Sequence, residues 1–363
     1  MAGEDLTSSE HAEPPRQPLP PEALRRPALE ASADSVVDAT WRLGLKSWFW
    51  GEGVCLLGML RVAAARGQTP PDRVVDFVTG HAARGLPLEH VNNLAPGAAA
   101  ALAALGTGRD DLRRVVVDCL TWLEGEARPG RAPGGALEHG PDGVWADTVF
   151  MAGSFLLHAG RLLERDDLVT EAVRQWLAHA EVLQHPESGL FAHGSHRGET
   201  IWSFWGRANA WTALAGVELC SLAQGVPGVD EVAQRVGTQL RELARLQPEH
   251  GVWDVLVDSQ AENRGILETS AAAGIGAAML RAGTVLPLDR ADRDALRRSG
   301  ALAVRGALAY LEDGVLTRVS AGTVLQLVPF GYSVIRDDRP QPWGQGLALE
   351  AIAAGLDAGE VPS

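Results

Sequence analysis

The chain has 363 residues, and 46% of them are hydrophobic, so it can build a sizeable core as one large domain or two ordinary ones. Its 32 basic and 46 acidic residues leave a formal net charge of −14. This acidic balance argues against nucleic acid or an anionic membrane as a partner. A small anionic substrate stays compatible with it, because one local arginine can override the overall field.

The three cysteines, Cys55, Cys119 and Cys220, lie far apart in apolar runs. This spacing indicates buried thiols in a reducing compartment, and neither a disulfide framework nor a CxxC metal site. No apolar stretch is long and uncharged enough to cross a bilayer, and the first residues lack the basic and apolar regions of a signal peptide. Together these features favour a cytoplasmic protein.

Residues 1–33 are rich in Pro, Glu and Ala, and we expect them to form a flexible N-terminal arm or an extended strap. From residue 34 to residue 363 no domain boundary is visible, and apolar side chains recur at spacings of three and four. The pattern predicts twelve helices, at residues 36–46, 52–66, 70–83, 96–106, 109–126, 146–164, 167–184, 204–224, 229–247, 268–283, 289–312 and 344–358.

Several helix starts carry recognisable signals. Pro70 and Pro71 open one predicted helix and Pro96 opens another, since proline is favoured in the first turn. Thr269 and Ser270 are expected to cap the helix that follows them. These signals support the helical interpretation of the periodicity.

Two kinds of connection alternate between the predicted helices. Short turns alternate with longer loops in which a polar residue and Gly precede a bulky apolar residue, at 141–145, 187–191, 249–253 and 312–316. A Trp-Gly pair also recurs at residues 50–51, 205–206 and 343–344. Six two-helix units predict an all-α (α/α)6 barrel with its long loops on one rim, and an open solenoid is the alternative. Trp-Gly pairs near both the first and the last helix favour closure.

Five segments, taken in order, resemble the unsaturated rhamnogalacturonyl and glucuronyl hydrolases of glycoside hydrolase family 105, a relative of family 88. The segments are residues 145–155, 189–193, 205–211, 267–274 and 342–346. The resemblance implies an (α/α)6 barrel without metal or cofactor. It also implies removal of a 4,5-unsaturated uronic acid from the non-reducing end of an oligosaccharide.

The substrate implied by this resemblance is a vinyl ether, which a polysaccharide lyase creates when it cuts a uronan. Its hydration needs a proton at C4 and water at C5. One carboxyl group can do both, first giving a proton and then taking one from water. Ordinary glycoside hydrolysis differs, because there two carboxyl groups flank the glycosidic bond.

Asp147 matches the family's acid/base position at the start of a predicted helix. The alternative is an ordinary first-turn aspartate that the helix dipole favours. A helix N-terminus lowers the pKa of a carboxyl group, whereas a proton donor needs a raised one. We therefore expect burial beside Trp145 to offset the dipole.

His193 matches a family position that contacts the unsaturated sugar, and its alternative is a structural histidine in a loop. His196 lies three residues on, and the pair resembles a metal motif. No carboxylate or cysteine cluster accompanies it in the sequence, so a metal site is not expected.

Arg207 and Trp211 are four residues apart, hence on one helical face. The resemblance makes them substrate-binding, with the arginine available for a bidentate bond to a carboxylate and the tryptophan for stacking on a sugar ring. A buried arginine paired with a helix end and a core tryptophan are the alternatives. Ala208 and Ala210 stand where the family usually has Gly, which leaves the shape of the substrate open.

The remaining candidates for substrate binding lie in other loops. Asn92 and Asn93 occupy a region where related enzymes commonly carry a second Asp, and alternatively they cap the helix at Pro96. Glu268 and Trp343 match family positions, and Trp48 does so more loosely. Glu268 is alternatively a helix cap, and Trp343 a packing wedge between the first and last hairpins.

Two other functions fit the same sequence. One is a different (α/α)6 carbohydrate enzyme, either a sugar epimerase or an unusual glycoside hydrolase. The departure from the family pattern at Ala208, Ala210 and the asparagine pair favours it. The other is a non-catalytic sugar-binding protein, since a fold does not guarantee a function. The source polysaccharide, the neighbouring sugar and the oligomeric state stay open.

Overall fold

The computed structural model describes residues 14–126 and 128–359, and long helices dominate them. All twelve predicted helices are present, and α12 adds a single turn. Their bounds are α1 (Arg26–Leu43), α2 (Trp50–Ala65), α3 (Asp72–Arg84), α4 (Leu94–Thr107), α5 (Asp110–Glu124), α6 (Ala146–Leu163), α7 (Asp166–Leu183), α8 (Gly206–Leu222), α9 (Val229–Arg245), α10 (Thr269–Val285), α11 (Arg290–Leu308), α12 (Phe330–Ser333) and α13 (Pro342–Ala358).

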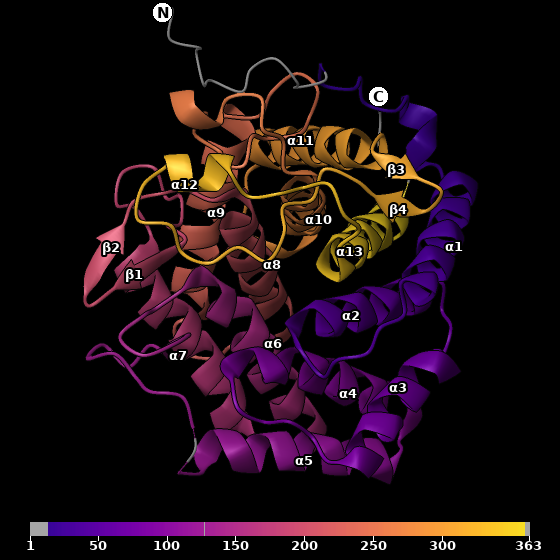
Figure 1. Ribbon diagram of the computed structural model, residues 1–363, viewed down its shortest axis with the longest axis vertical. Coiled ribbons are helices and arrows are strands. Elements are labelled where there is room, and N and C mark those ends of the chain that lie inside the picture. Colours follow the sequence, from indigo (N-terminus) through magenta and orange to yellow (C-terminus); the bar gives the residue numbers. More distant parts are fainter. Residues whose placement is uncertain (1–13, 127, 360–363) are drawn as a thin grey trace, which may run out of the picture.

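Six of these helices form a closed inner ring. In the order α2, α4, α6, α8, α10 and α13, each packs against the next, and α13 returns to pack against α2 (Figure 1). The helices α1, α3, α5, α7, α9 and α11 lie outside the ring, and α1 packs on α13. The predicted (α/α)6 barrel is therefore confirmed, and the open solenoid is wrong.

The start of α1 corrects the expected N-terminal arm. The helix begins at Arg26 with Pro27 in its first turn, ten residues before the predicted start. Leu29, Ala33 and Val36 are fully buried, and their spacings of four and three place them on one face of the helix, toward the ring. This apolar face favours a helix here despite the Pro- and Glu-rich composition. Residues 14–20 run without regular structure across the end of α11, where the Leu19 N–H donates to the Arg305 carbonyl at 3.2 Å. Residues 1–13 lie outside the described residues.

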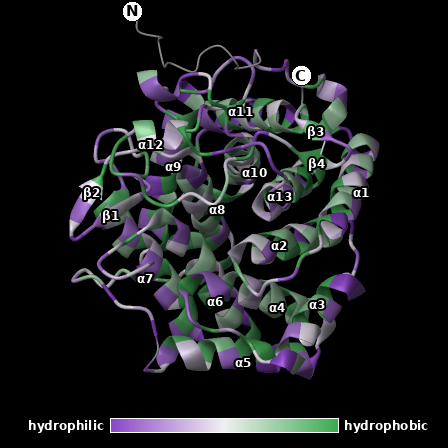
Figure 2. Cartoon of the chain, viewed as in Figure 1, coloured by the Kyte–Doolittle hydropathy of each residue, from purple (hydrophilic) through white to green (hydrophobic). Residues whose placement is uncertain are grey.

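Inner and outer helices differ in how they are buried. In α4 most residues are buried on all sides, and many of them are alanine, which lets neighbouring helices approach closely. The outer helix α5 is amphipathic, and Figure 2 shows hydrophilic and hydrophobic residues alternating along it. Despite the apolar inner ring, no helix in the described part of the chain has the length and apolar character needed to cross a membrane.

The long loops meet on one rim, where the inner helices begin. They include two short antiparallel hairpins, β1 (Gly194–His196) with β2 (Glu199–Ile201) and β3 (Leu311–Glu312) with β4 (Val315–Leu316). Isolated bridges pair Trp145 with Gly194, Trp205 with Leu256 and Asp254 with Leu267. These bridges form a belt of backbone pairs that fixes where α6, α8 and α10 start.

Ring closure depends on two glycines where α2 crosses α13. A Cβ on Gly58 would lie 2.6 Å from the Gly346 carbonyl oxygen, and a Cβ on Gly346 would lie 2.5 Å from the Val54 carbonyl group. Both obstacles are backbone atoms, which cannot rotate away. The two helices can therefore touch only because neither glycine has a side chain.

We predict that Gly346→Ala lowers the free energy of unfolding by about 1–3 kcal/mol, because the added methyl group overpacks this crossing. Gly153→Ala in α6 is the matched control, since a Cβ there meets no atom within 4 Å. It should leave stability unchanged or raise it by up to about 1 kcal/mol through helix propensity. Denaturant unfolding measures both, and equal stability of the two variants would contradict the packing argument.

Candidate active site

The belt brings Asp147 and His193 together. The Ala146 N–H, first in α6, donates to the His193 carbonyl at 2.9 Å, and the Ser195 N–H donates to the Val144 carbonyl at 2.8 Å. This pairing sets Asp147 Oδ2 3.5 Å from His193 Nε2. That distance is longer than a strong hydrogen bond, and neither atom has a hydrogen-bond partner. Both atoms therefore have hydrogen-bonding capacity that the described protein groups do not use.

Aromatic rings enclose the His193 side chain. Its ring lies 5.3 Å from that of Trp145 and 4.3 Å from that of Trp205. His139 stacks on Trp145 with ring centres 4.5 Å apart and an interplanar angle of 9°. The side chain of Asp147 retains 13% exposure, so it is accessible from the rim while His193 is fully buried.

The pKa of Asp147 is lowered, against the expectation from sequence. Burial raises it, but the facing His193 lowers it, and the charges of His139 and Arg207 add to that effect. The neighbouring groups together therefore outweigh the desolvation of this carboxyl. For His139 itself, burial lowers the pKa to about 4, so its ring is neutral at neutral pH.

Arg207 is completely buried, and the protein already uses both its Nη atoms. Nη1 donates to the Ser320 carbonyl at 2.8 Å, and Nη2 donates to the Ala321 carbonyl at 2.9 Å. Its guanidinium lies 4.4 Å from the Trp205 ring centre, and the Trp50 and Trp343 rings are also close. Arg207 therefore brings positive charge to the site and not the free pair of donors expected from the sequence; only its Nε lacks a partner.

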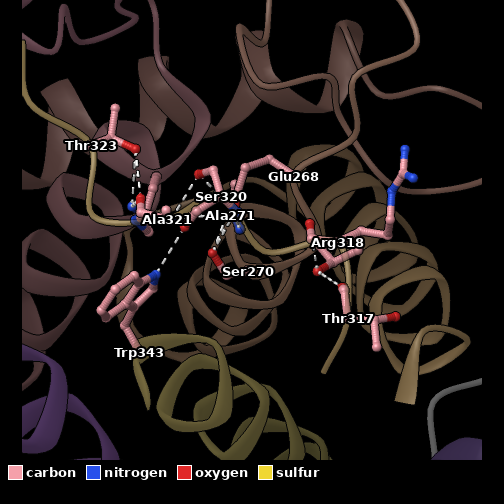
Figure 3. A network of polar contacts seen from close by, with 11 residues as sticks. Glu268, Ser270, Ala271, Thr317, Arg318, Ser320, Ala321, Thr323 and Trp343 are labelled. Atoms are coloured by element: carbon pink, nitrogen blue, oxygen red, sulfur yellow. Dashed lines mark hydrogen bonds and ion pairs between the residues drawn. The ribbon is translucent and has the colours of Figure 1, made fainter. Parts of the chain in front are cut away.

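Glu268 pairs with Arg207 and caps α10. Its carboxylate lies 3.4 Å from Arg207 Nη1 and accepts from the Ala271 N–H, the Ser270 hydroxyl and, at 3.0 Å, the Ser320 N–H (Figure 3). Glu268, and not Thr269 or Ser270, is thus the cap of this helix. The structure thus shows the alternative role, the helix cap, and these contacts occupy the carboxylate.

Two of the tryptophans beside Arg207, Trp50 and Trp343, also contact each other. Trp50 and Trp343 stack with ring centres 4.3 Å apart, and both are partly exposed. The Trp343 Nε1–H donates to the Ser320 carbonyl at 3.1 Å (Figure 3). Trp211 meets Trp50 edge-on at 6.5 Å but is fully buried, as is nearly all of Trp48, which packs on His81. Trp50 and Trp343 are therefore partly accessible at the rim, whereas Trp211 and Trp48 are buried.

Asn92 and Asn93 make different contacts. Asn93 Oδ1 accepts from the His90 N–H at 2.8 Å, and its Nδ2 donates to the Trp48 carbonyl at 2.8 Å, so it holds the loop before α4. Asn92 Nδ2 points to His139 Nε2 at 3.4 Å, and its buried Oδ1 has no partner. Only Asn92 thus connects to the group around Asp147.

Two residues of this site, His139 and Tyr332, carry no signal in the sequence. Tyr332 Oη lies 2.7 Å from His193 Nδ1, although Tyr332 comes from a segment without helical periodicity. His139 precedes the turn at Gly143, and no motif marked it. Trp50 was visible only as part of the Trp-Gly pattern. Within the described ranges no group of three or more His, Cys, Asp or Glu side chains could hold a metal ion, and His196 is exposed while His193 is buried.

A closed helical barrel with a carboxylate among aromatic rings on its loop rim suits a carbohydrate-active enzyme. The profile of glycosyl hydrolase family 88 matches residues 32–356. The chain belongs to this family and is a glycoside hydrolase.

Individual relatives agree with this assignment. The unsaturated rhamnogalacturonyl hydrolase YesR of Bacillus subtilis is 31% identical over 336 residues, which cover 88% of this chain and 92% of YesR. A possible family 105 member from Salmonella enterica superposes with a TM-score of 0.82 at 24% identity and covers 98% of this chain and 99% of its own. The unsaturated glucuronyl hydrolase of Bacillus sp. GL1 superposes with a TM-score of 0.69 at 16% identity, over 89% and 94% of the chains. The two structures share the fold of this chain.

We predict that Glu268→Gln lowers the free energy of unfolding by about 3–5 kcal/mol, because it leaves the buried charge of Arg207 without its counter-ion. Glu312→Gln is the control, since Glu312 pairs with Arg16 on the surface, and such a pair contributes less than about 1 kcal/mol. Chemical denaturation compares the two variants. A loss for Glu268→Gln no larger than that of the control would show that this pair is not needed for stability.

Proposed function

We propose that the protein removes a 4,5-unsaturated uronic acid from the non-reducing end of lyase-generated oligosaccharides by hydrating its vinyl ether. The observation that carries the proposal is the Asp147 carboxylate, with one oxygen unpartnered and facing His193 at the rim of a family 88 barrel. Glu268, the other carboxylate nearby, is occupied by its capping contacts. A single available carboxyl group suits hydration, whereas ordinary glycoside hydrolysis needs two.

The reaction assigned to Asp147 has two proton transfers. The protonated carboxyl gives its proton to C4, and positive charge develops at C5 and its ring oxygen. The carboxylate then takes a proton from a water molecule as that water adds to C5. The product is a hemiketal, which opens and releases the neighbouring sugar. Asp147 ends protonated, as it began.

The surroundings of Asp147 suit an anionic, planar sugar. The buried charge of Arg207 attracts the uronate carboxylate, and its unpartnered Nε is the donor left for hydrogen bonding. The stacked Trp50 and Trp343 rings offer a flat apolar wall for the unsaturated ring. His193 Nε2 and Asn92 Oδ1 are free to bond to sugar hydroxyls.

The similar proteins support this activity. YesR is named as an unsaturated rhamnogalacturonyl hydrolase, and the Bacillus sp. GL1 structure is that of an unsaturated glucuronyl hydrolase responsible for glycosaminoglycan degradation. We propose for this chain the reaction class that the two share, removal of an unsaturated uronic acid from an oligosaccharide. Nucleic acid is not a proposed partner. We also propose a cytoplasmic location, because Cys55, Cys119 and Cys220 are all free and buried.

We predict that Asp147→Asn abolishes the loss of ultraviolet absorbance that follows hydration of the conjugated C=C–carboxylate group, because the amide can neither give nor take the proton. Asp142→Asn, on the exposed turn before α6, should keep full activity. A panel of lyase products, followed by absorbance and by mass, measures both variants.

The same panel separates the alternatives. Hydration adds the mass of one water, an epimerase changes no mass, and a sugar-binding protein binds without turnover. Full activity of Asp147→Asn would contradict the assignment of this residue.

We predict that the fall of kcat with rising pH begins at a higher pH than the fall of kcat/KM. In the free enzyme the surroundings keep the pKa of Asp147 below its ordinary value of 3.8, and kcat/KM reports this state. In the complex the uronate anion adds negative charge beside Asp147, which raises its pKa, and kcat reports that state. Profiles of both constants across pH test this, and a kcat that falls at the same or a lower pH would contradict it.

A further inference from the structure

The segment between β4 and α13 is exposed except where it enters the site. Val324, Leu327, Val328, Phe330 and Val334 are all more than half exposed, whereas Tyr332, between the last two, is completely buried. Arg207 holds the beginning of this segment through Ser320 and Ala321. Tyr332 is thus the point at which an otherwise solvent-facing loop meets the side chains around Asp147.

The hydrogen bonds of Tyr332 have a defined direction. The Gln326 N–H points to Tyr332 Oη at 3.5 Å, so the phenol oxygen accepts there. Tyr332 Oη lies 2.7 Å from His193 Nδ1, and its own proton is then available for that nitrogen. Burial, with the negative charge of Asp147 adding to it, raises the pKa of Tyr332, so the phenol keeps this proton.

We propose that Tyr332 is a positioning residue that fixes the tautomer of His193. With Tyr332 donating to Nδ1, a neutral His193 ring carries its hydrogen on Nε2, since the bond made by one ring nitrogen decides which nitrogen is protonated. That hydrogen faces Asp147 Oδ2 across 3.5 Å. For catalysis this inference rests on the function proposed above; the tautomer itself does not.

The opposite tautomer would work against Asp147. With the hydrogen on Nδ1, the Nε2 lone pair would face the carboxylate oxygen and repel it. The ring cannot easily turn to avoid this, because Trp145 and Trp205 pack against it. The other ionisable groups around Asp147 are His139, in the loop before α6, and Arg207, and neither contacts His193 Nδ1. Tyr332 alone among them therefore controls that nitrogen.

The test compares Tyr332→Phe with Tyr310→Phe, which removes the chain's other tyrosine hydroxyl. Tyr310 is also buried, and its hydroxyl accepts from the Arg16 N–H away from the site. Nitrogen-15 spectra of histidine-labelled protein at a pH where imidazole is neutral report the tautomer, and the signals of His193 are identified by their loss in His193→Gln. Turnover is followed by the absorbance of the unsaturated substrate.

We expect the wild type and Tyr310→Phe to show His193 protonated on Nε2, and Tyr332→Phe to show a mixture or the Nδ1 form. Tyr332→Phe should also lower kcat roughly tenfold, which corresponds to the loss of about one hydrogen bond in the transition state. An Nδ1-protonated His193 in the wild type, or an unchanged tautomer in Tyr332→Phe, would overturn the proposal. If no unsaturated substrate turns over, the proposed function fails, and the spectra still decide the role of Tyr332.

Discussion

The site depends on the contact that closes the ring, where α13 packs on α2 through Gly58 and Gly346. These helices come from opposite ends of the chain, and their first turns carry Trp343 and Trp50. Because the backbones touch, the two rings stack 4.3 Å apart at the rim. An open array of the same hairpins would leave each ring in solvent and the guanidinium of Arg207 without two of its three aromatic neighbours.

Closure also makes a fully buried arginine tolerable. A buried guanidinium is costly unless it is paired and its hydrogen-bond donors are satisfied. Glu268 supplies the counter-charge, and the loop at 317–323 supplies carbonyl oxygens. The same loop leads to Tyr332, so the carbonyl oxygens that accept from Arg207 and the hydroxyl that we propose orients His193 belong to one segment. The hydrogen bonds of Arg207 and the geometry of His193 are thereby linked through residues 320–332.

Much of this architecture could be predicted from the sequence, because helix periodicity and repeated loop signatures are local properties. The residues that enclose Asp147 were harder to predict. For Arg207 the sequence allows both a clamp for a carboxylate and a buried, paired arginine, since no periodic pattern shows that residues 317–323 fold over it. Tyr332 carried no signal at all, because its partner His193 lies 139 residues away. Contacts between loops of distant hairpins depend on closure, which a one-dimensional pattern does not encode.

The charge balance around Asp147 explains why the amide at position 92 matters. Asn92 contacts His139, and a carboxylate in its place would add negative charge near Asp147 and so raise the pKa of that group. With an amide there, the effects of His193, His139 and Arg207 outweigh the desolvation, and the pKa of Asp147 lies below its ordinary value. In the reaction proposed for Asp147, the proton for C4 is then taken up as the substrate binds, because the uronate carboxylate adds negative charge beside Asp147. A neutral sugar would not raise the pKa of Asp147 in this way, so the proposed mechanism itself favours an anionic substrate.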